Sequence, residues 1–204
     1  MNIGIVVFDD AEELDFVGPW EVLTSSNQVF AWQGKEAPDS VFLVSEDGGE
    51  VRCAKGMRVL AEHSFDSCPA LDVILLPGGQ GTRREMKNPA MLDFVRRQAE
   101  GCAWVTSVCT GSFVLVAAGP ARARRVTTHW AAFGELAAIE GVGEMVRDRR
   151  YVRDGNLVTA AGVSAGIDMA IWLTGERFGA AHGAAVQKAI QYQPEPPFPA
   201  QASL

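Results

Sequence analysis

The sequence predicts an α/β fold, with a mostly parallel sheet covered by helices on both faces. Short apolar runs typical of buried strands alternate with helical segments along the whole chain. Parallel strands need helical crossovers, so this alternation indicates a sheet buried on both sides. The 204 residues are 48% hydrophobic and 21% charged, which suffices for a sizeable core. No internal repeat or linker divides the chain, so we expect a single domain over residues 1–204.

The first half of the chain contains most of the predicted strands. Residues 3–8 (IGIVVF) have no helical period and predict a buried strand. An acidic loop, residues 9–13, follows this strand. A helix is expected to begin at Gly18-Pro19, because a helix tolerates proline in its first turn. Further short strands are predicted at residues 41–44, 51–53, 57–61 and 73–76.

The second half alternates more regularly. Asn88-Pro89 combines a good N-cap residue with proline at the first helical position, so a helix is predicted from there to about Glu100. A strand at residues 103–108 then breaks into a helical run at 113–118. The remaining predicted elements are strands at 126–128, 151–152 and 157–160, and helices from about 131, over 165–178 and over 180–191. The proline-rich residues 193–204 are predicted to form an extended tail.

Charge and hydropathy argue against nucleic-acid and membrane partners, and the N-terminus bears on where the protein is located. The formal net charge of -7, from 25 acids and 18 bases, argues against nucleic acid or an anionic membrane as a partner. The one basic cluster, Arg122 to Arg125, is expected to be a solvated loop, with a ligand site as the alternative. No apolar stretch approaches the roughly 20 residues of a membrane span. The N-terminus lacks signal-peptide features, which predicts a cytoplasmic protein with reduced thiols.

Three segments deliver unusual residues to one edge of the predicted sheet. Asp15 follows the first strand, Gly78-Gly79 follow the strand at 73–76, and Cys109 ends the strand at 103–108. In open parallel sheets, the ligand crevice lies beyond the carboxyl ends of the strands. The sequence therefore predicts that an acid, a glycine turn and a thiol meet there. The three histidines and four cysteines form no CxxC or HExxH pattern, so no metal site is expected.

Cys109 is the most informative residue of this group. It lies at a strand-to-helix turn, where Thr110-Gly111-Ser112 permit a sharp and strained corner. The positive end of the following helix favours a thiolate, and nearby backbone N–H groups could bind developing negative charge. The alternative is a buried structural thiol. Cys53, Cys68 and Cys102 lack such a corner and are expected to be packing residues.

The neighbours of Cys109 allow more than one role. A carboxylate beside a thiolate is stable only if the two share a proton, which would make Asp15 a ready general acid. The alternative is that Asp15 caps the helix that Gly18-Pro19 begins. Thr110 could donate hydrogen bonds or simply start the next helix. A Cys–His hydrolase would need His129 near the sulfur, but its neighbours favour a structural role at a strand end.

Six segments, spread over nearly the whole chain, carry a resemblance to a known family. They are residues 14–23 (LDFVGPWEVL), 76–81 (LPGGQG), 105–112 (VTSVCTGS), 127–130 (TTHW), 152–157 (VRDGNL) and 162–168 (GVSAGID). PGG followed by a strand-borne cysteine resembles the DJ-1/PfpI superfamily. The combination of LDxxGP, VCTGS, TTHW and AGID resembles its isonitrile hydratase (isocyanide hydratase) branch, which includes amidase-like domains of some AraC-type regulators.

This resemblance implies a flavodoxin-like sandwich of the class I glutamine amidotransferase-like type, usually a homodimer, without metal or organic cofactor. It implies that Cys109 is the nucleophile, Asp15 its acidic partner and Thr110 an assisting residue. Protease and glyoxalase-like relatives often carry His after the cysteine, so Thr110 argues against those activities. The regulators carry a helix-turn-helix domain after this one, and no DNA-binding half is expected in this chain.

The function that the resemblance implies is hydration of an isonitrile to an N-substituted formamide through a Cys109 thioimidate. The substrate would be small and neutral, in a pocket lined by residues such as Phe16, Trp20 or Val163, with Gly79 and Gly78 as auxiliary donors. Two alternatives stay open. One is a glyoxalase or amide hydrolase that uses Cys109 with His129, and the other is a non-enzymatic thiol sensor of oxidants.

Overall fold

The computed structural model describes residues 1–198 and confirms the predicted α/β fold. The strands of its main sheet are β1 (Asn2–Val6), β2 (Ser40–Ser45), β5 (His63–Ser64), β6 (Val73–Leu76), β7 (Trp104–Val108), β8 (Tyr151–Asp154) and β9 (Leu157–Ala160). They lie in the order β5-β2-β1-β6-β7-β9-β8. Neighbouring strands are parallel, except that β8 pairs with β9 in the antiparallel sense.

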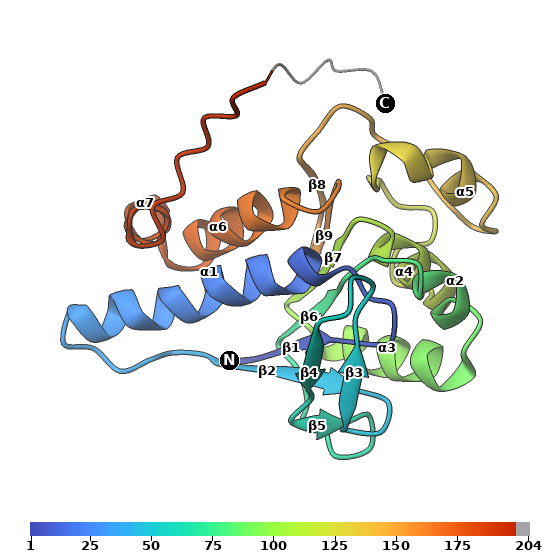
Figure 1. The fold of residues 1–204 in the computed structure, drawn as a ribbon, viewed down its shortest axis with the longest axis horizontal. Coiled ribbons are helices and arrows are strands. Elements are labelled where there is room, and N and C mark those ends of the chain that lie inside the picture. Colours follow the sequence, from blue (N-terminus) through green and yellow to red (C-terminus); the bar gives the residue numbers. More distant parts are fainter. Residues whose placement is uncertain (199–204) are drawn as a thin grey trace.

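Helices cover both faces of this sheet (Figure 1). One face is covered by α1 (Glu13–Trp32) and α6 (Ala165–Phe178), on which α7 (Ala180–Ala189) packs. The other is covered by α3 (Pro89–Gly101) and α4 (Gly111–Ala118), with α2 (Thr82–Glu85) beside α4. The 3-10 helix η1 (Trp130–Ala132) continues into α5 (Phe133–Ala137), and β3 (Glu50–Arg52) pairs with β4 (Arg58–Leu60) in a separate hairpin.

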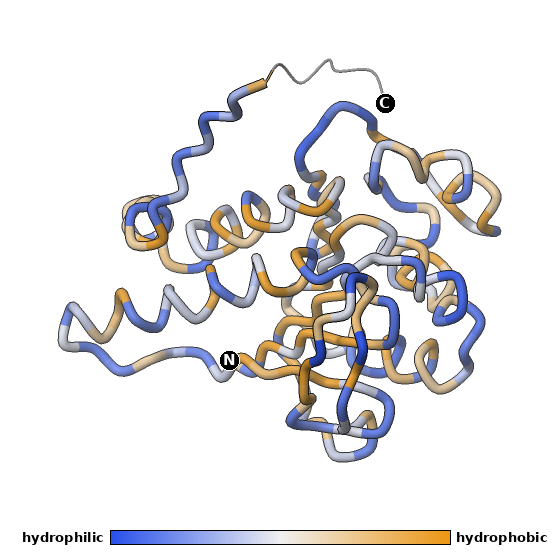
Figure 2. The backbone as a smooth tube through the Cα atoms, viewed as in Figure 1, coloured by the Kyte–Doolittle hydropathy of each residue, from blue (hydrophilic) through white to orange (hydrophobic). Residues whose placement is uncertain are grey.

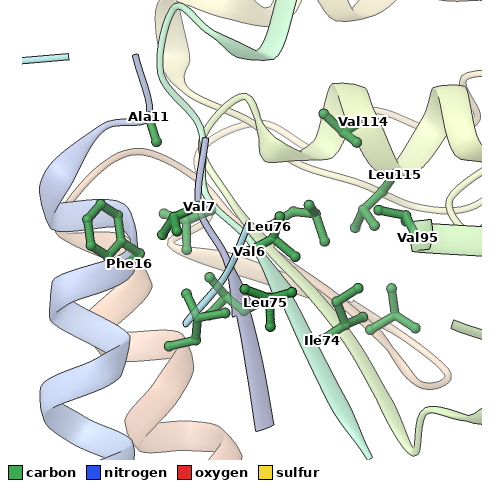
Figure 3. Packing of buried hydrophobic residues seen from close by; sticks show 14 of the residues in the cluster. Val6, Val7, Ala11, Phe16, Ile74, Leu75, Leu76, Val95, Val114 and Leu115 are labelled. Atoms are coloured by element: carbon green, nitrogen blue, oxygen red, sulfur yellow. The ribbon is translucent and has the colours of Figure 1, made fainter. Parts of the chain in front are cut away.

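The core lies on both sides of the central strands. Most residues of these strands are hydrophobic, as the colours in Figure 2 show. Phe16 packs on one face of the sheet, while Val95 and Leu115 pack on the other (Figure 3). Leu76 at the end of β6 is fully buried between the two layers. Burial of each such side chain stabilises the fold by about 1.5–3 kcal/mol. This core holds rigidly the strand ends from which the candidate site is built.

The start of α1 differs from the prediction. The helix begins at Glu13, so Pro19 lies inside it rather than in its first turn. Two glycines allow α1 and α6 to pack closely. A Cβ added to Gly18 of α1 would lie 2.8 Å from Ile167 Cγ1 of α6, and a Cβ added to Gly166 of α6 would lie 3.2 Å from Pro19 Cγ of α1. Close packing of α1 on α6 therefore outweighs the local cost of an internal proline. As a result, Asp15 lies in the first turn of a helix and not in a loop.

Other elements were predicted with mixed success. The N-cap of α3 is confirmed, because Asn88 Oδ1 accepts a hydrogen bond from Ala90 N at 3.1 Å. The predicted strand at 126–128 is wrong: only an isolated bridge joins Val126 to Met145. The side chain of Thr159 accepts the Thr127 N–H at 2.8 Å, which holds this segment without a ladder. Strand β5 and helix α2 were not predicted, because both are too short to show a period.

The structure describes the first six residues of the predicted tail. Residues 193–198 contain no helix or strand, and Pro194 to Pro196 line a pocket together with Asp168, Ile171 and Trp172 of α6. The rest of the predicted tail, residues 199–204, lies outside the described residues. None of the described helices combines the length and the apolar character that crossing a membrane requires.

Candidate active site

The glycine turn after β6 brings the predicted site residues together. A Cβ placed on Gly78 would lie 2.6 Å from Thr110 N, 2.7 Å from Cys109 Cβ and 2.8 Å from Asp15 Oδ2. Any side chain at this position would force the backbone of the cysteine turn to move, so only glycine fits. The structure thus places the acid, the thiol and Thr110 around one point at the carboxyl edge of the sheet, as predicted.

Asp15 is held by this turn and is fully buried. Its Oδ2 accepts the Gly78 N–H at 2.7 Å. Its other oxygen, Oδ1, is buried without a hydrogen-bond partner among the described residues. Asp15 does not cap α1, because the N-cap residue is Glu12 and no side chain caps that end. The capping alternative is therefore wrong, and a free carboxyl oxygen remains inside the site.

Cys109 occupies the strained corner that the sequence predicts. Its φ of 56° lies in the left-handed region, which costs a residue with a side chain about 1–3 kcal/mol. Its N–H donates to Ala160 O at 3.1 Å, and its carbonyl accepts from Thr128 Oγ1 at 2.9 Å and Ser112 Oγ at 3.1 Å. These three bonds tie the corner to its neighbours on both sides and keep the strained conformation in place.

The electrostatics of the pair differ from the expectation of a stable thiolate. Burial, followed by the Asp15 charge, raises the pKa of Cys109 from 9.0 to about 12, although Thr110 backbone and side-chain hydrogen bonds oppose the shift. Burial also raises the pKa of Asp15 from 3.8 to about 7, against the lowering effect of the Gly78 N–H. Desolvation therefore outweighs the helix N-terminus at this thiol. Between these two pKa values the pair holds one proton, so the two groups do not ionise together.

Gly79 and Thr110 form the other side of the site. Gly79 has a φ of 112°, which favours glycine, and its N–H donates to Thr110 Oγ1 at 3.1 Å. The two amides predicted to contact substrate thus have protein acceptors: Gly78 N–H binds Asp15, and Gly79 N–H binds Thr110. Both orient the side chains of the site.

A pocket of about 320 Å³ opens in front of Cys109. Of the three side chains predicted to line it, Val163 does so, whereas Phe16 is buried in the core and Trp20 does not contribute. The predicted apolar lining is therefore only partly correct. The lining residues are Glu12, Ala54, Gly79, Gln80, Arg83, Cys109, Thr110, His129, Ala131, Ala132, Glu135 and Val163.

His129 shares this pocket but is oriented by its own helix. Its Nδ1 accepts the Ala131 N–H at 3.3 Å, at the start of η1. Burial lowers the pKa of His129, which favours the neutral ring. No hydrogen bond joins His129 to Cys109 among residues 1–198. This arrangement agrees with the predicted structural role.

Sequence reasoning missed a second group of residues around the glycine turn. Thr82 Oγ1 donates to Gly79 O at 2.8 Å and lies 3.0 Å from Thr110 Oγ1. Arg83 Nη1 donates to the same carbonyl at 3.1 Å, and Arg83 also forms two hydrogen bonds with Glu135. The only signal in the sequence was the position of Thr82 and Arg83 directly after the PGGQG turn.

The remaining cysteines fit their predicted packing role. Cys53 and Cys102 are buried, Cys68 is half-buried, and all three are free thiols. Burial raises the pKa of each above 9.0, to about 11 for Cys53 and Cys68 and about 12 for Cys102. In the part of the chain that the structure describes, no group of three or more His, Cys, Asp or Glu side chains is placed to hold a metal ion.

Several known proteins are similar to this chain in sequence. The model of the DJ-1/PfpI family matches residues 1–174. The isonitrile hydratase of Pseudomonas putida is 41% identical over 198 residues, which cover 97% of this chain and 81% of that protein. The HTH-type transcriptional regulator GbdR of Pseudomonas aeruginosa is 27% identical over 194 residues, which cover 94% of this chain and 51% of the regulator.

Solved structures give the same result for the fold. A ThiJ/PfpI family protein from Pseudomonas syringae superposes with a TM-score of 0.87 at 28% identity, over 98% of this chain and 78% of that one. Drosophila melanogaster DJ-1beta superposes with a TM-score of 0.79 at 22% identity, over 93% of this chain and 97% of that one. At this lower identity the likeness concerns the fold alone.

Proposed function

The chain belongs to the DJ-1/PfpI family, and from this premise we propose that it hydrates isonitriles, R–N≡C, to N-substituted formamides. The observation that carries the proposal is the buried Asp15 carboxyl, with one free oxygen, beside a cysteine at a strained corner. The 41% identity to an isonitrile hydratase over almost the whole chain supports the same reaction. Cys109, Asp15 and Thr110 are the residues to which we assign the chemistry.

The first half of the reaction uses the proton that the pair shares. In the reactive tautomer, Cys109 is a thiolate and Asp15 a carboxylic acid. The sulfur attacks the terminal carbon of the isonitrile, and Asp15 protonates that carbon as the C–S bond forms. The product is a thioimidate, R–N=CH–S–Cys109, with Asp15 now ionised. A buried acid with a pKa near 7 is suited to this transfer at neutral pH.

The second half uses the same carboxylate as a base. Asp15 takes a proton from water as the water oxygen bonds to the thioimidate carbon, and then passes that proton to the substrate nitrogen. The C–S bond breaks as the new hydroxyl returns its proton to Asp15 and becomes the formamide carbonyl. The products are R–NH–CHO and the original pair with its one shared proton, so water is the only reactant consumed besides the isonitrile.

The charges around the pocket support a neutral substrate. Glu12 is paired with Lys55, and Arg83 is paired with Glu135 at 2.6 Å. A charged substrate would have to compete with one of these ion pairs. The volume of about 320 Å³ also favours a small R group. We therefore propose a small, uncharged isonitrile as the substrate class.

Turnover of a simple alkyl isonitrile, followed as formamide formation, tests this proposal. We expect turnover by the wild type and none by Cys109→Ser. Asp15→Asn should lower kcat by about 10²–10⁴-fold, the range expected when a general acid is lost. The matched control is Cys68→Ser, which removes a thiol outside the pocket and should retain wild-type turnover. A folded wild type that forms no formamide would contradict the proposal, and wild-type turnover by Asp15→Asn would remove Asp15 from the mechanism.

The glyoxalase or amidase alternative has less support. It needs His129 as the base for Cys109, but the hydrogen bond at Nδ1 directs that ring toward its own helix. If the alternative is correct, the wild type consumes methylglyoxal and His129→Ala abolishes that activity. The hydratase proposal expects the wild type to show no such turnover.

A further inference from the structure

A second cavity, of about 500 Å³, lies at the other end of strand β7 from Cys109. Val105, near the start of β7, lines this cavity, whereas Cys109 follows the last residue of the strand. The two cavities have no lining residue in common. Three arginines line the second one: Arg96 of α3, and Arg122 and Arg124 of the loop after α4. In a chain with a net charge of -7, this local positive charge indicates a candidate site for an anion.

The side chain of Arg122 has a fixed stem and an unpaired head. Its Nε donates to Val116 O, near the C-terminal end of α4, at 3.3 Å. A Cβ added to Gly141 would lie 3.2 Å from Arg122 Cγ, so the aliphatic part of the side chain packs against that turn. Within residues 1–198, the Nε bond is the only hydrogen bond of this guanidinium, and no carboxylate forms a salt bridge with it. Both Nη groups are therefore left to bind a ligand.

The other two arginines of the cavity are already paired. Arg96 donates from Nε to Ala118 O at 3.3 Å and from Nη1 to Asp93 Oδ1 at 2.6 Å. Its Nη2 has no hydrogen-bond partner among the described residues. Arg124 forms a salt bridge with Asp154 at 3.6 Å. These two side chains add donors and positive potential, but the arginine without a carboxylate partner is the third one.

The rest of the lining indicates the class of anion. The last turn of α4, residues 117–119, lines the cavity, and the C-terminal end of a helix carries partial negative charge. Glu100, an exposed side chain, adds a full negative charge, so the cavity disfavours a dianion such as phosphate. Ala99, Val105 and Pro120 supply apolar surface. A guanidinium fork binds both oxygens of a carboxylate in parallel.

We propose that this cavity binds a small monocarboxylate with a short apolar chain, whose carboxylate is held by the Nη groups of Arg122. The volume of about 500 Å³ is within the usual range for sites of small molecules. The proposal does not depend on the proposed function, because the catalytic pocket contributes no residue to this site. The competing explanation is that the arginines only cap the C-terminal end of α4, for which the Nε bonds of Arg96 and Arg122 suffice.

Titration with hexanoate at low ionic strength, followed by the NMR shifts of backbone amides, tests the proposal. We expect saturable shifts in residues 99–105 and 117–124 and none around Gly78. Arg122→Met keeps the aliphatic stem and should weaken hexanoate binding at least about tenfold, because the charge-assisted hydrogen bonds are lost. Cys109→Ser should bind hexanoate as tightly as the wild type does.

Two controls separate a built site from general surface charge. Arg125 belongs to the same basic cluster, but it pairs with Glu144 at 3.1 Å and does not line the cavity, so Arg125→Met should keep the wild-type affinity. Hexan-1-ol has the same chain without the charge and should cause no saturable shifts. The proposal is wrong if Arg122→Met binds hexanoate like the wild type, or if Arg125→Met weakens binding equally. Inorganic phosphate that binds as tightly as hexanoate would contradict the assigned class of ligand.

Glu100 provides a second route if Arg122→Met does not fold. Glu100→Gln removes the one acid of the lining without touching the arginines. We expect it to tighten hexanoate binding about two- to threefold at low ionic strength, and the gain should disappear at high salt. Unchanged or weaker binding at low ionic strength would contradict a carboxylate bound in this cavity.

Discussion

At the scale of residues, the proposed reaction depends on one proton held by the pair of Asp15 and Cys109. Burial raises the pKa of both groups, and the Asp15 charge raises the pKa of Cys109 further, whereas a hydrogen bond with Cys109 lowers the pKa of Asp15. A thiol that was simply activated by a helix N-terminus would behave differently, because its pKa would be lowered. The pH dependence of the reaction distinguishes the two cases.

We expect kcat/KM for an isonitrile to fall about tenfold per pH unit below pH 7 and to be level between pH 8 and 9. Below the Asp15 pKa of about 7, the pair holds two protons and contains no nucleophile. Above it, one proton remains, and it is retained up to the Cys109 pKa of about 12. A pH-rate profile checks this. Activity that persists unchanged to pH 5 would show that Cys109 is an independent, low-pKa thiolate.

At the scale of elements, the outer wall of the pocket is the segment of η1 and α5. It contributes His129, Ala131, Ala132 and Glu135 to the lining. Arg83 on α2 binds both oxygens of Glu135, at 2.9 and 2.6 Å. Among the described residues, these are the only side-chain hydrogen bonds that join residues 129–137 to another segment. Ala132 and Leu136 are buried in the hydrophobic core and anchor the segment to it.

We expect Glu135→Ala to raise KM for the isonitrile by about two- to fivefold and to change kcat less. Loss of a half-exposed ion pair costs at most about 1 kcal/mol. It should also speed hydrogen exchange of the amides in α5. The matched control is Glu144→Ala, which breaks the exposed Arg125–Glu144 pair outside the pocket and should leave KM unchanged. An unchanged KM for Glu135→Ala would show that the core contacts alone hold this wall.

At the scale of the whole molecule, the raised pKa of Asp15 predicts that the site costs the fold stability. Asp15 is ionised above pH 3.8 in the unfolded chain but only above about pH 7 in the folded one. Its contribution to the free energy of unfolding is therefore reduced above pH 3.8, with the full reduction present above pH 7. A shift of roughly three pKa units corresponds to about 4 kcal/mol. The left-handed backbone conformation of Cys109 lowers the free energy of unfolding further.

We expect Asp15→Asn to raise the free energy of unfolding at pH 8 by about 2–4 kcal/mol, and by progressively less as the pH falls to 4. Asparagine keeps an acceptor for the Gly78 N–H and removes the buried charge. Denaturant unfolding at several pH values measures this. Asp39→Asn is the control, because Asp39 binds Arg177 through two hydrogen bonds, and its loss should destabilise the fold instead. A stability loss in Asp15→Asn at pH 8 would contradict the assigned cost.

From the sequence alone we could predict the two residues of the pair and the order of most elements, but not β5 and α2, and the strand predicted at 126–128 was wrong. Apolar runs and capping residues are local signals, so β6, β7 and α3 were predicted close to their observed bounds. The small residues after Cys109 predicted its strained corner, because only small neighbours permit it. The glycine turn and Asp15 followed from the edge to which parallel strands lead.

The start of α1, the pKa of Cys109 and the contacts around the Gly79 carbonyl could not be predicted from the sequence. They depend on burial and on contacts between residues far apart in the chain, for which local sequence patterns give no signal. Gly18 and Pro19 pack on α6 inside the helix. Helix α1 therefore begins at Glu13 and not at Gly18 as predicted, and Asp15 lies on the helix. Burial reversed the expected direction of the Cys109 pKa. The link from Thr82 through the Gly79 carbonyl to Thr110 joins residues from two strand ends. It exists only because β6 and β7 lie side by side in the sheet.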